Sequence, residues 1–415
     1  MSRTTLSPAR ILERCEALAA LTEEEGRLTR TFLSPQHRAA SELVGQWMAA
    51  AGMSARVDAI GNICGRLEGE RPGLPCLMLG SHLDTVRDAG KYDGMLGVVA
   101  AIECVADLRG RGTRLPFAVE VIGFADEEGV RFGSTLLGSR AVAGTFQPEV
   151  LEITDRDGVS MAHALRRAGL DPAAIPTAAR RRGGVLAYAE LHIEQGPVLE
   201  DEGLPVGVVT AINGATRLAV EIAGMAGHAG TVPMNLRRDA LAAASECVLE
   251  VERICRATPE LVGTVGQIEA RPGATNVIPG AARFSVDVRS PRDAERREAV
   301  RSIESAIQDI AARRKVKATI TPMHEGKTAA CAPWLMEQLG AAIEAEALPV
   351  RKLPSGAGHD GMAMAELTDI GMLFVRCERG ISHHPAEAVT QADVETGTRV
   401  FLRFIENFRP HGGKS

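Results

Sequence analysis

Two apolar runs with a helical stretch between them constrain the fold of this chain more than any other feature. CLMLGSHLD begins at Cys76 and FAVEVIGFAD begins at Phe117, and each is a mostly apolar run that ends in polar residues. Such runs are typical of strands that are covered on both faces, as in parallel sheets. Residues 94–109, which lie between the runs, have a helical pattern. The sequence therefore predicts a strand, helix, strand unit of an α/β sheet.

Further elements are predicted on both sides of this unit. A helix begins at Ser34-Pro35, because serine is a favoured N-cap and proline a favoured first residue, and it ends at Gly52. A hairpin is expected over residues 55–69, and residues 185–195 form another apolar strand.

The pattern changes in the middle of the chain. Residues 214–328 alternate as β-α-β-β-α-β, which resembles a ferredoxin-like layer of two helices on one sheet. A helix over 334–348 and a strand over 371–377 then return to the α/β pattern. A chain of 415 residues is long enough for two domains. We therefore predict one domain from 1–213 and 329–415, with 214–328 inserted as a second.

Composition and charge narrow the classes of partner. The formal charge is only −6 with both signs spread along the chain, which predicts no nucleic-acid partner and no membrane surface. The run Arg180-Arg181-Arg182 is expected to be a solvated loop, since no aromatic residues are interleaved with it. The N-terminal segment has no apolar core like that of a signal peptide, and no stretch is apolar enough to span a bilayer. Eight scattered cysteines without a Cys-x-x-Cys pair indicate buried, reduced thiols and a cytoplasmic protein.

Five polar clusters stand near the ends of predicted core strands or directly before a helix. In open α/β sheets, ligands bind at the carboxyl ends of the strands. The clusters are GSHLDTV with His82 and Asp84, KYDGMLG with Asp93, the acids Asp126-Glu127-Glu128, ELHIEQG with Glu190, His192, Glu194 and Gln195, and GISHHPAE with His383 and His384. Imidazole and carboxylate groups without a thiolate suit Zn²⁺, Mn²⁺ or a similar ion. These residues alone indicate a metal-dependent hydrolase.

The three adjacent acids need a separate explanation. Neighbouring side chains of a regular strand point to opposite faces, so Glu127 and Glu128 can serve one site only where the strand has ended. Three adjacent carboxylates also repel one another unless positive charge lies among them. Their position therefore supports a cation site.

The order of the motifs resembles a known enzyme family. GSHLDTV, YDGMLG, ADEEGVRF, LHIEQGPVLE, GHAGTVPM, ATNVIPG, DVR, SGAGHD and SHHPAE follow one another as in the hydantoinase/carbamoylase branch of the M20 family of metal-dependent amidohydrolases. The resemblance extends over nearly the whole chain. It implies a catalytic domain whose mixed sheet is flanked by helices and which holds two divalent ions, Zn or Mn. It also implies that the inserted ferredoxin-like α+β domain serves as a lid and forms a homodimer.

The resemblance implies roles for individual residues. The expected metal ligands are His82, Asp93, Glu128, His192 and His383, with Asp93 bridging the two ions. His383 is chosen over His384 because the family ligand directly follows serine. Glu127 is expected to be the general base, which takes a proton from the attacking water and passes it to the leaving nitrogen. Asp84 is expected to orient the His82 imidazole, and Asp126 to support the loop.

A second set of residues is expected to bind the substrate. A guanidinium offers the fork that binds a carboxylate bidentately, and an amide can meet a ureido or carboxylate group. His228 is also expected to polarise the carbonyl in catalysis, either in its own chain or in the partner's site. The set is Gln195, Arg217, His228, Asn276, Arg289 and Gly358. The alternative for Arg217 and Arg289 is that they are exposed sheet residues in ion pairs.

The expected reaction is hydrolysis of the ureido C–N bond of a small carboxylate. The segment GRLTRTFLSPQHRAA and the position of Arg217 favour an allantoate amidohydrolase. An N-carbamoyl-L-amino acid hydrolase is the alternative, and ureidoglycolate and β-ureidopropionate hydrolases share the expected ligands. Two further hypotheses are an M20 peptidase or aminoacylase, which the HIEQG and GAGHD motifs disfavour, and a silent binding protein. The latter would be expected to have lost Glu127 or a ligand.

Overall fold

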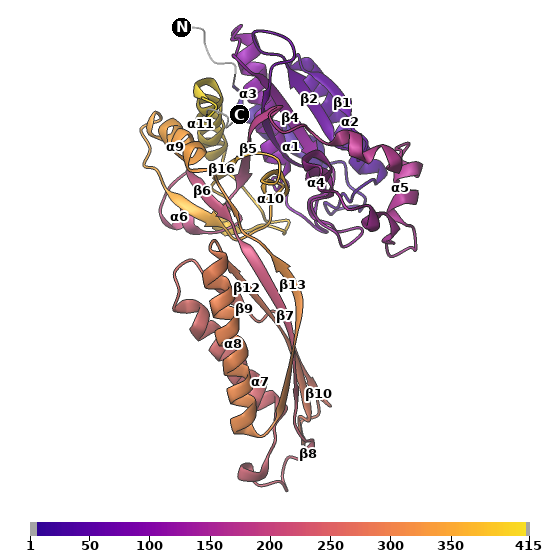
Figure 1. Cartoon of the computed structure of the whole chain (residues 1–415), viewed down its shortest axis with the longest axis vertical. Coiled ribbons are helices and arrows are strands. Elements are labelled where there is room, and N and C mark those ends of the chain that lie inside the picture. The colour runs from indigo at the N-terminus through magenta and orange to yellow at the C-terminus, as the bar shows by residue number, and fades with distance from the viewer. Residues whose placement is uncertain (1–5, 412–415) are drawn as a thin grey trace. The chain divides into compact units, whose positions relative to one another are not determined.

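The structure is a computed structural model that describes residues 6–411 (Figure 1). The chain divides into two compact units. The first unit contains the residues up to Thr210, Ala330–Leu353 and the residues from Ala357 onward. The second unit contains Ala211–Ala329 and Pro354–Gly356, and so includes all of the segment expected to be an insertion.

The first unit is built on a mixed sheet in the order β1-β2-β4-β3-β5-β16-β6. Its central strands run parallel to one another and are buried along almost their whole length. They are β3 (Cys76–His82), β4 (Ala118–Phe124), β5 (Val185–Ile193) and β16 (Ile370–Val375). Three outer strands run antiparallel to their neighbours: β1 (Ser54–Val57), β2 (Ile63–Leu67) and β6 (Val206–Ile212). The short strands β14 (Ala329–Ala330) and β15 (Lys352–Ser355) pair with β6. The predicted α/β sheet and its hairpin are confirmed.

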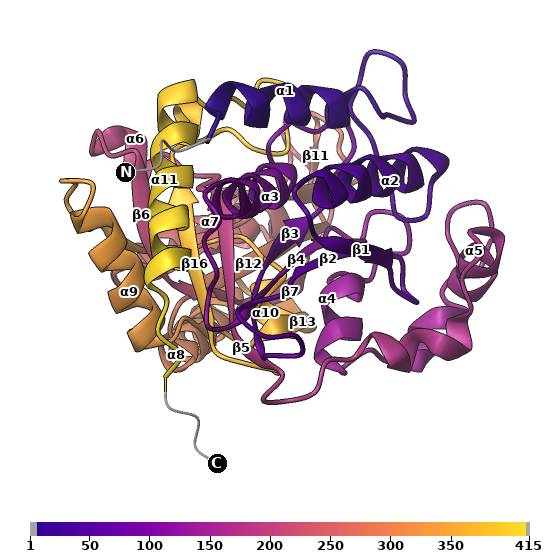
Figure 2. The same ribbon diagram turned by 90° about the horizontal axis from the view of Figure 1, so that it is seen from above.

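Helices cover both faces of this sheet (Figure 2). The larger apolar core lies on one face, under α1 (Pro8–Ala19), α2 (Pro35–Ala50), α3 (Met95–Gly110), α9 (Pro333–Glu344) and α11 (Gln391–Asn407). The short helices α4 (Leu137–Ala143) and α10 (Gly361–Met364) lie on the other side, and α5 (Met161–Arg167) and α6 (Val198–Asp201) stand outside these layers. As predicted, Ser34 caps α2, where its hydroxyl accepts from the His37 backbone N–H and proline occupies the first turn.

Strand β5 shows how the alternation of side chains positions polar groups. Leu191 and Ile193 belong to the larger apolar core, so His192 and Glu190 point to the opposite face. Gly97 of α3 allows this helix to approach closely, because a Cβ atom there would lie 2.2 Å from the Leu191 carbonyl oxygen. The strand is therefore buried on both faces while it still presents His192 near its carboxyl end.

The second unit has one antiparallel sheet in the order β10-β12-β7-β13, with β9 also paired to β12. Its strands are β7 (Gly214–Ala223), β9 (Val262–Thr264), β10 (Ile268–Arg271), β12 (Ala281–Ser290) and β13 (Lys317–Gly326). The helices α7 (Ala240–Arg256) and α8 (Asp293–Arg314) pack on one face of the sheet through an apolar core. A separate two-stranded ribbon pairs β8 (Gly227–His228) with β11 (Val277–Ile278). This arrangement confirms the predicted ferredoxin-like α+β pattern.

Two further sequence predictions concern thiols and membranes. All eight cysteines are free and buried, as predicted. Among residues 6–411, the structure contains no helix of sufficient length and apolar character to cross a bilayer.

Candidate metal centre

Five side chains of the first unit meet near the carboxyl ends of its parallel strands. Asp93 Oδ1 lies 3.2 Å from His82 Nε2 and 3.3 Å from His192 Nε2. Asp93 Oδ2 lies 3.2 Å from His383 Nε2, which in turn lies 3.4 Å from Glu128 Oε1. One carboxylate therefore stands at the centre of three imidazoles and a second acid.

Several elements bring these residues together. His82 ends β3, His192 lies near the end of β5, and Glu128 follows β4 in the loop where the strand has ended. Asp93 precedes α3 through Gly94, whose φ is +74° and whose Cβ position would lie 2.5 Å from the His82 ring. Only glycine fits there without strain, which explains the Asp-Gly pair in KYDGMLG.

Hydrogen bonds at the far side of two imidazoles indicate a cation at the near side. His82 Nδ1 lies 3.0 Å from the Asp84 carbonyl oxygen, and His192 Nδ1 lies 2.8 Å from the Ile193 carbonyl oxygen. An imidazole that donates its Nδ1 proton to a carbonyl presents a lone pair at Nε2. Both lone pairs then face a carboxylate oxygen of Asp93, and acceptors face one another in this way only when positive charge lies among them. The donor set therefore fits a divalent metal ion.

The ligand atoms form two overlapping groups. His82, Asp93 and His192 place one ligand atom each within 4.8 Å of one another, and so do Asp93, Glu128 and His383. Asp93 belongs to both groups. Further combinations of the same kind include Glu190, His192 and His359, and His82, Glu127 and Glu128.

The pKa values of these groups show the same need for positive charge. Burial lowers the pKa of His82, but hydrogen bonds with Asp84 and Asp93 outweigh burial and raise it well above its usual value. Burial and the nearby charges of Asp84 and Asp93 raise the pKa of Glu127 to about 7. Burial together with Glu127 and Asp93 raises the pKa of Glu128 to about 10. A bound cation would lower the pKa of each acid, because it stabilises the carboxylate.

Two carboxylates hold the loop that carries the adjacent acids. Asp84 accepts hydrogen bonds from the backbone N–H groups of Glu127 and Glu128, at 3.0 and 3.1 Å. Asp126 accepts from the backbone N–H of Gly129 at 3.1 Å. The predicted contact between Asp84 and His82 is made chiefly by the Asp84 carbonyl, since the Asp84 carboxylate is 3.6 Å from the imidazole.

The structure adds supporting residues that sequence reasoning missed. Glu387 accepts from the backbone N–H groups of Tyr92 and Asp93, at 2.8 and 3.1 Å. Ser382 Oγ lies 2.7 Å from Asp93 Oδ2 and 2.8 Å from Glu387 Oε2. Both residues stand in GISHHPAE, so the motif itself was the available signal.

Two residues predicted to bind substrate lie beside this centre in the first unit. The Gln195 amide donates to Asp93 Oδ2 at 2.6 Å, so in this structure it contacts the central carboxylate. The Cβ position of Gly358 would lie 3.6 Å from Glu127 Oε1, which places the Gly358 backbone next to the expected base. His359 follows directly, and its ring packs edge-on against His192.

The remaining predicted substrate residues belong to the second unit. Arg217 and Arg289 both bind Asp287, with Nε to carboxylate distances of 2.9 Å in each case. Arg289 also donates to the Gly356 carbonyl oxygen at 2.8 Å. His228 pairs with Val277 on the separate ribbon, and the next residue, Ala229, donates its backbone N–H to the Asn276 carbonyl oxygen at 2.9 Å. The ion pairs expected in the alternative explanation for Arg217 and Arg289 are thus present.

Comparison with known proteins identifies the family. The model of peptidase family M20/M25/M40 matches residues 78–407. An N-carbamoyl-L-amino acid amidohydrolase of Geobacillus stearothermophilus is 42% identical, over 92% of this chain and 94% of the relative. An allantoate deiminase of Arabidopsis thaliana is 41% identical, over 95% of this chain and 81% of the relative. A crystal structure of a hydantoinase/carbamoylase family amidase from Burkholderia multivorans superposes with a TM-score of 0.91 at 32% identity, covering 96% of this chain and 97% of that one. The chain belongs to peptidase family M20/M25/M40 and is a metal-dependent amidohydrolase of its hydantoinase/carbamoylase branch.

Proposed function

We propose that this enzyme hydrolyses the ureido C–N bond of a small carboxylate and that allantoate is its substrate. The observation that carries the proposal is the buried Asp93 carboxylate, shared by three imidazoles next to Glu127. Relatives named for allantoate and for N-carbamoyl-L-amino acids are equally similar, at 41% and 42% identity. The choice of allantoate rests on the segment GRLTRTFLSPQHRAA and on the position of Arg217, and N-carbamoyl-L-amino acids are the second candidate.

Two divalent ions, Zn or Mn, would occupy the centre. His82 and His192 would hold one ion, Glu128 and His383 the other, and Asp93 would bridge them, in agreement with the two groups of ligand atoms. When bound, such ions polarise a carbonyl group and lower the pKa of water.

Glu127 is the proposed general base. Its side chain is buried, and its backbone is fixed by the Asp84 carboxylate. From this position the carboxylate would take a proton from the attacking water and pass it to the leaving nitrogen. The water-poor surroundings strengthen the electrostatic interactions of the transition state. The expected products include ammonia and carbon dioxide.

Arg289 is the proposed anchor of the substrate carboxylate, together with Arg217 and Asn276. Two nitrogens of Arg289, Nε and Nη2, already bind Asp287, at 2.9 and 3.0 Å, so the guanidinium is held in one orientation. A group oriented before binding loses less entropy when the substrate arrives. Gln195 and Gly358 are proposed to contact the ureido end, since both lie beside the candidate metal centre.

We expect Arg289→Lys to lower kcat/KM on the acid substrate by about 10- to 100-fold, because lysine keeps the charge and loses the fork. Metal content should stay unchanged. Arg283→Lys, on the same strand and exposed, is the matched control and should have little effect. If Arg289→Lys weakens an amidated substrate as much as the acid, Arg289 does not bind the carboxylate.

The enzyme is also proposed to be a homodimer formed through the second unit. Six apolar side chains of this unit are more than half exposed, which supports an interface there. They are Met225, Met234, Leu236, Leu249, Val262 and Met323. We further propose that His228 acts in the partner's site, and the eight buried free thiols support a cytoplasmic location.

Mixing two inactive variants tests the action of His228 in the partner's site. After subunit exchange between Glu127→Ala and His228→Ala, one site of each mixed dimer would contain both residues. Activity should then return to about a quarter of the wild-type value, from the statistics of a twofold dimer. Activity that stays at the level of the separate variants, with exchange verified by mass spectrometry, would show that His228 acts in its own chain.

A substrate panel tests the proposed function. Ammonia release would be measured with allantoate, an N-carbamoyl-L-amino acid, ureidoglycolate and β-ureidopropionate, and cleavage with a dipeptide. We expect the highest kcat/KM with allantoate and no cleavage of the dipeptide. A preference for the N-carbamoyl-L-amino acid would support the second candidate, whereas cleavage of the dipeptide alone would contradict the proposal.

A further inference from the structure

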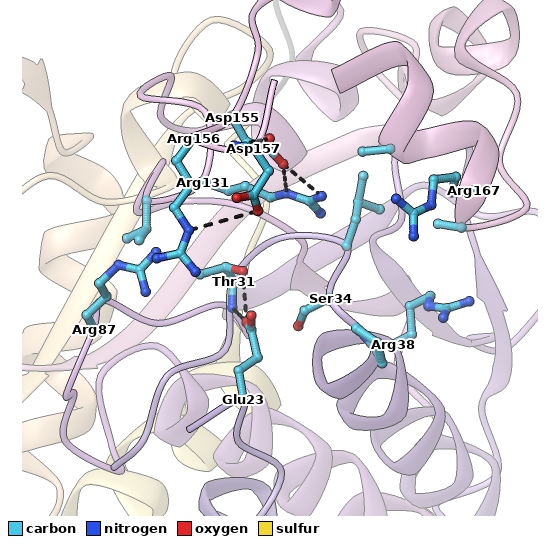
Figure 3. Close-up of a pocket in the computed structure, with 15 residues that line it drawn as sticks. Glu23, Thr31, Ser34, Arg38, Arg87, Arg131, Asp155, Arg156, Asp157 and Arg167 are labelled. Atoms are coloured by element: carbon cyan, nitrogen blue, oxygen red, sulfur yellow. Dashed lines mark hydrogen bonds and ion pairs between the residues drawn. The ribbon is translucent and has the colours of Figure 1, made fainter. Parts of the chain in front are cut away.

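A pocket of the first unit is lined by residues other than those proposed for catalysis (Figure 3). Its volume is about 280 Å³, and its walls include the start of α2, the loop after β4 and part of α5. None of the residues proposed to bind metal or substrate lines it. Five arginines and three acids do so: Arg38, Arg87, Arg131, Arg156, Arg167, Glu23, Asp155 and Asp157.

The best-buried acid of the pocket is already fully bound. Asp155 Oδ1 accepts from the backbone N–H groups of Asp157 and Val159, each at 3.0 Å. Its other oxygen accepts from Arg131 Nε at 3.1 Å. Glu23 accepts from the hydroxyl of Thr31 at 2.8 Å. Of the five arginines of the pocket, only Arg131 pairs with a largely buried acid among residues 6–411.

The other arginines leave positive charge in excess. Arg87 pairs with Glu24 at 3.2 Å, and Arg156 lies 4.0 Å from Asp157, both at exposed positions where ion pairs contribute little. Arg38 and Arg167 have no acidic partner within residues 6–411. Figure 3 shows these two residues and Ser34 on one side of the pocket. This side combines unpaired guanidinium groups with a buried hydroxyl.

Ser34 adds a buried hydroxyl to the same side. Ser34 is 5% exposed, and its oxygen accepts from the His37 backbone N–H at 3.1 Å. Its own hydroxyl proton has no acceptor in the described part of the chain. The N-terminal end of the 16-residue helix α2 carries the positive end of the helix dipole, although Pro35 has no backbone N–H and the His37 and Arg38 N–H groups already bind Ser34. The Ser34 hydroxyl, the start of α2, Arg38 and Arg167 thus lie on one side of the pocket.

We propose that this pocket binds a small phosphate-bearing anion. Guanidinium groups and helix N-termini both bind phosphate, whose oxygens accept hydrogen bonds from several directions. A planar carboxylate would use fewer of these donors, which come from α2 and from α5. The site is distinct from the candidate metal centre and its proposed substrate residues.

Phosphate titration of the metal-loaded enzyme at constant ionic strength tests the proposal. Isothermal calorimetry would compare the wild type with Arg38→Gln, Arg167→Gln and Arg166→Gln. Arg166 is the matched control, because it is exposed, neighbours Arg167 in α5 and does not line the pocket. Each pocket variant should weaken the affinity of one phosphate-binding site by about tenfold or more, and the control variant should leave that affinity unchanged. Phosphate bound at the metals would not respond to Arg38 or Arg167.

Three outcomes would overturn the proposal. Phosphate binding that is the same in the wild type and in both pocket variants would show that no such site exists. Equal weakening by Arg166→Gln would show a general effect of surface charge. Malonate that binds as tightly as phosphate, with the same dependence on Arg38 and Arg167, would assign the pocket to carboxylates instead.

Phosphate should also raise the Tm of the wild type and of Arg166→Gln more than that of the pocket variants.

Discussion

Replacing Glu127 by glutamine should lower kcat by about 10²- to 10⁴-fold while the metal content stays the same. Glutamine preserves the size of the side chain and removes its ability to take up a proton. The backbone N–H of residue 127 still binds Asp84, so the loop should keep its position. Initial rates of ammonia release and metal analysis by mass spectrometry would be measured on the same preparation.

Glu128→Gln is the matched comparison, because the two acids are adjacent and both backbone N–H groups bind Asp84. Glu128 Oε1 lies near His383, so its loss should reduce metal content as well as activity. The difference between the two variants is the expected result. Equal loss of metal in both would contradict the separate roles of base and ligand.

Asp93→Asn should abolish activity by removing metal. The carboxylate of Asp93 contacts three imidazoles, so an amide would leave two proposed ions without their shared anion. We expect metal affinity to fall by more than about a hundredfold. Loss of a residue that only supports a ligand already lowers metal affinity by about 10- to 100-fold, and Asp93 is itself a proposed ligand. Asp88→Asn is the control, since Asp88 lies in the same segment outside the ligand groups. Full metal content in Asp93→Asn would exclude a bridging role.

The sequence predicted the central strands well because their pattern is local. The apolar runs that became β3, β4 and β5 are recognisable without any knowledge of their neighbours, and Ser34-Pro35 marks the start of α2 by itself. The helices α4 and α10 were missed, because seven and four residues are too few for a helical period to be visible.

The details of the candidate site depend on contacts that no local pattern contains. The contact of Ser382 with Asp93 joins residues 289 positions apart. The adjacent acids predicted that the strand ends before them, but the sequence could not show that Asp84 holds both of their backbone N–H groups. Arg289 forms the ion pair of the alternative explanation, and its role in substrate binding stays a proposal, since an ion pair with Asp287 can also orient a residue that binds substrate.

Metal titration of the metal-free enzyme tests the central claim most directly. Zinc or manganese would be added in known amounts, and ammonia release from allantoate and from an N-carbamoyl-L-amino acid would be followed. We expect no ammonia release without metal and a rise that reaches its maximum at two equivalents per chain. Full activity of the metal-free enzyme, or no hydrolysis of either ureido acid at two equivalents, would contradict it.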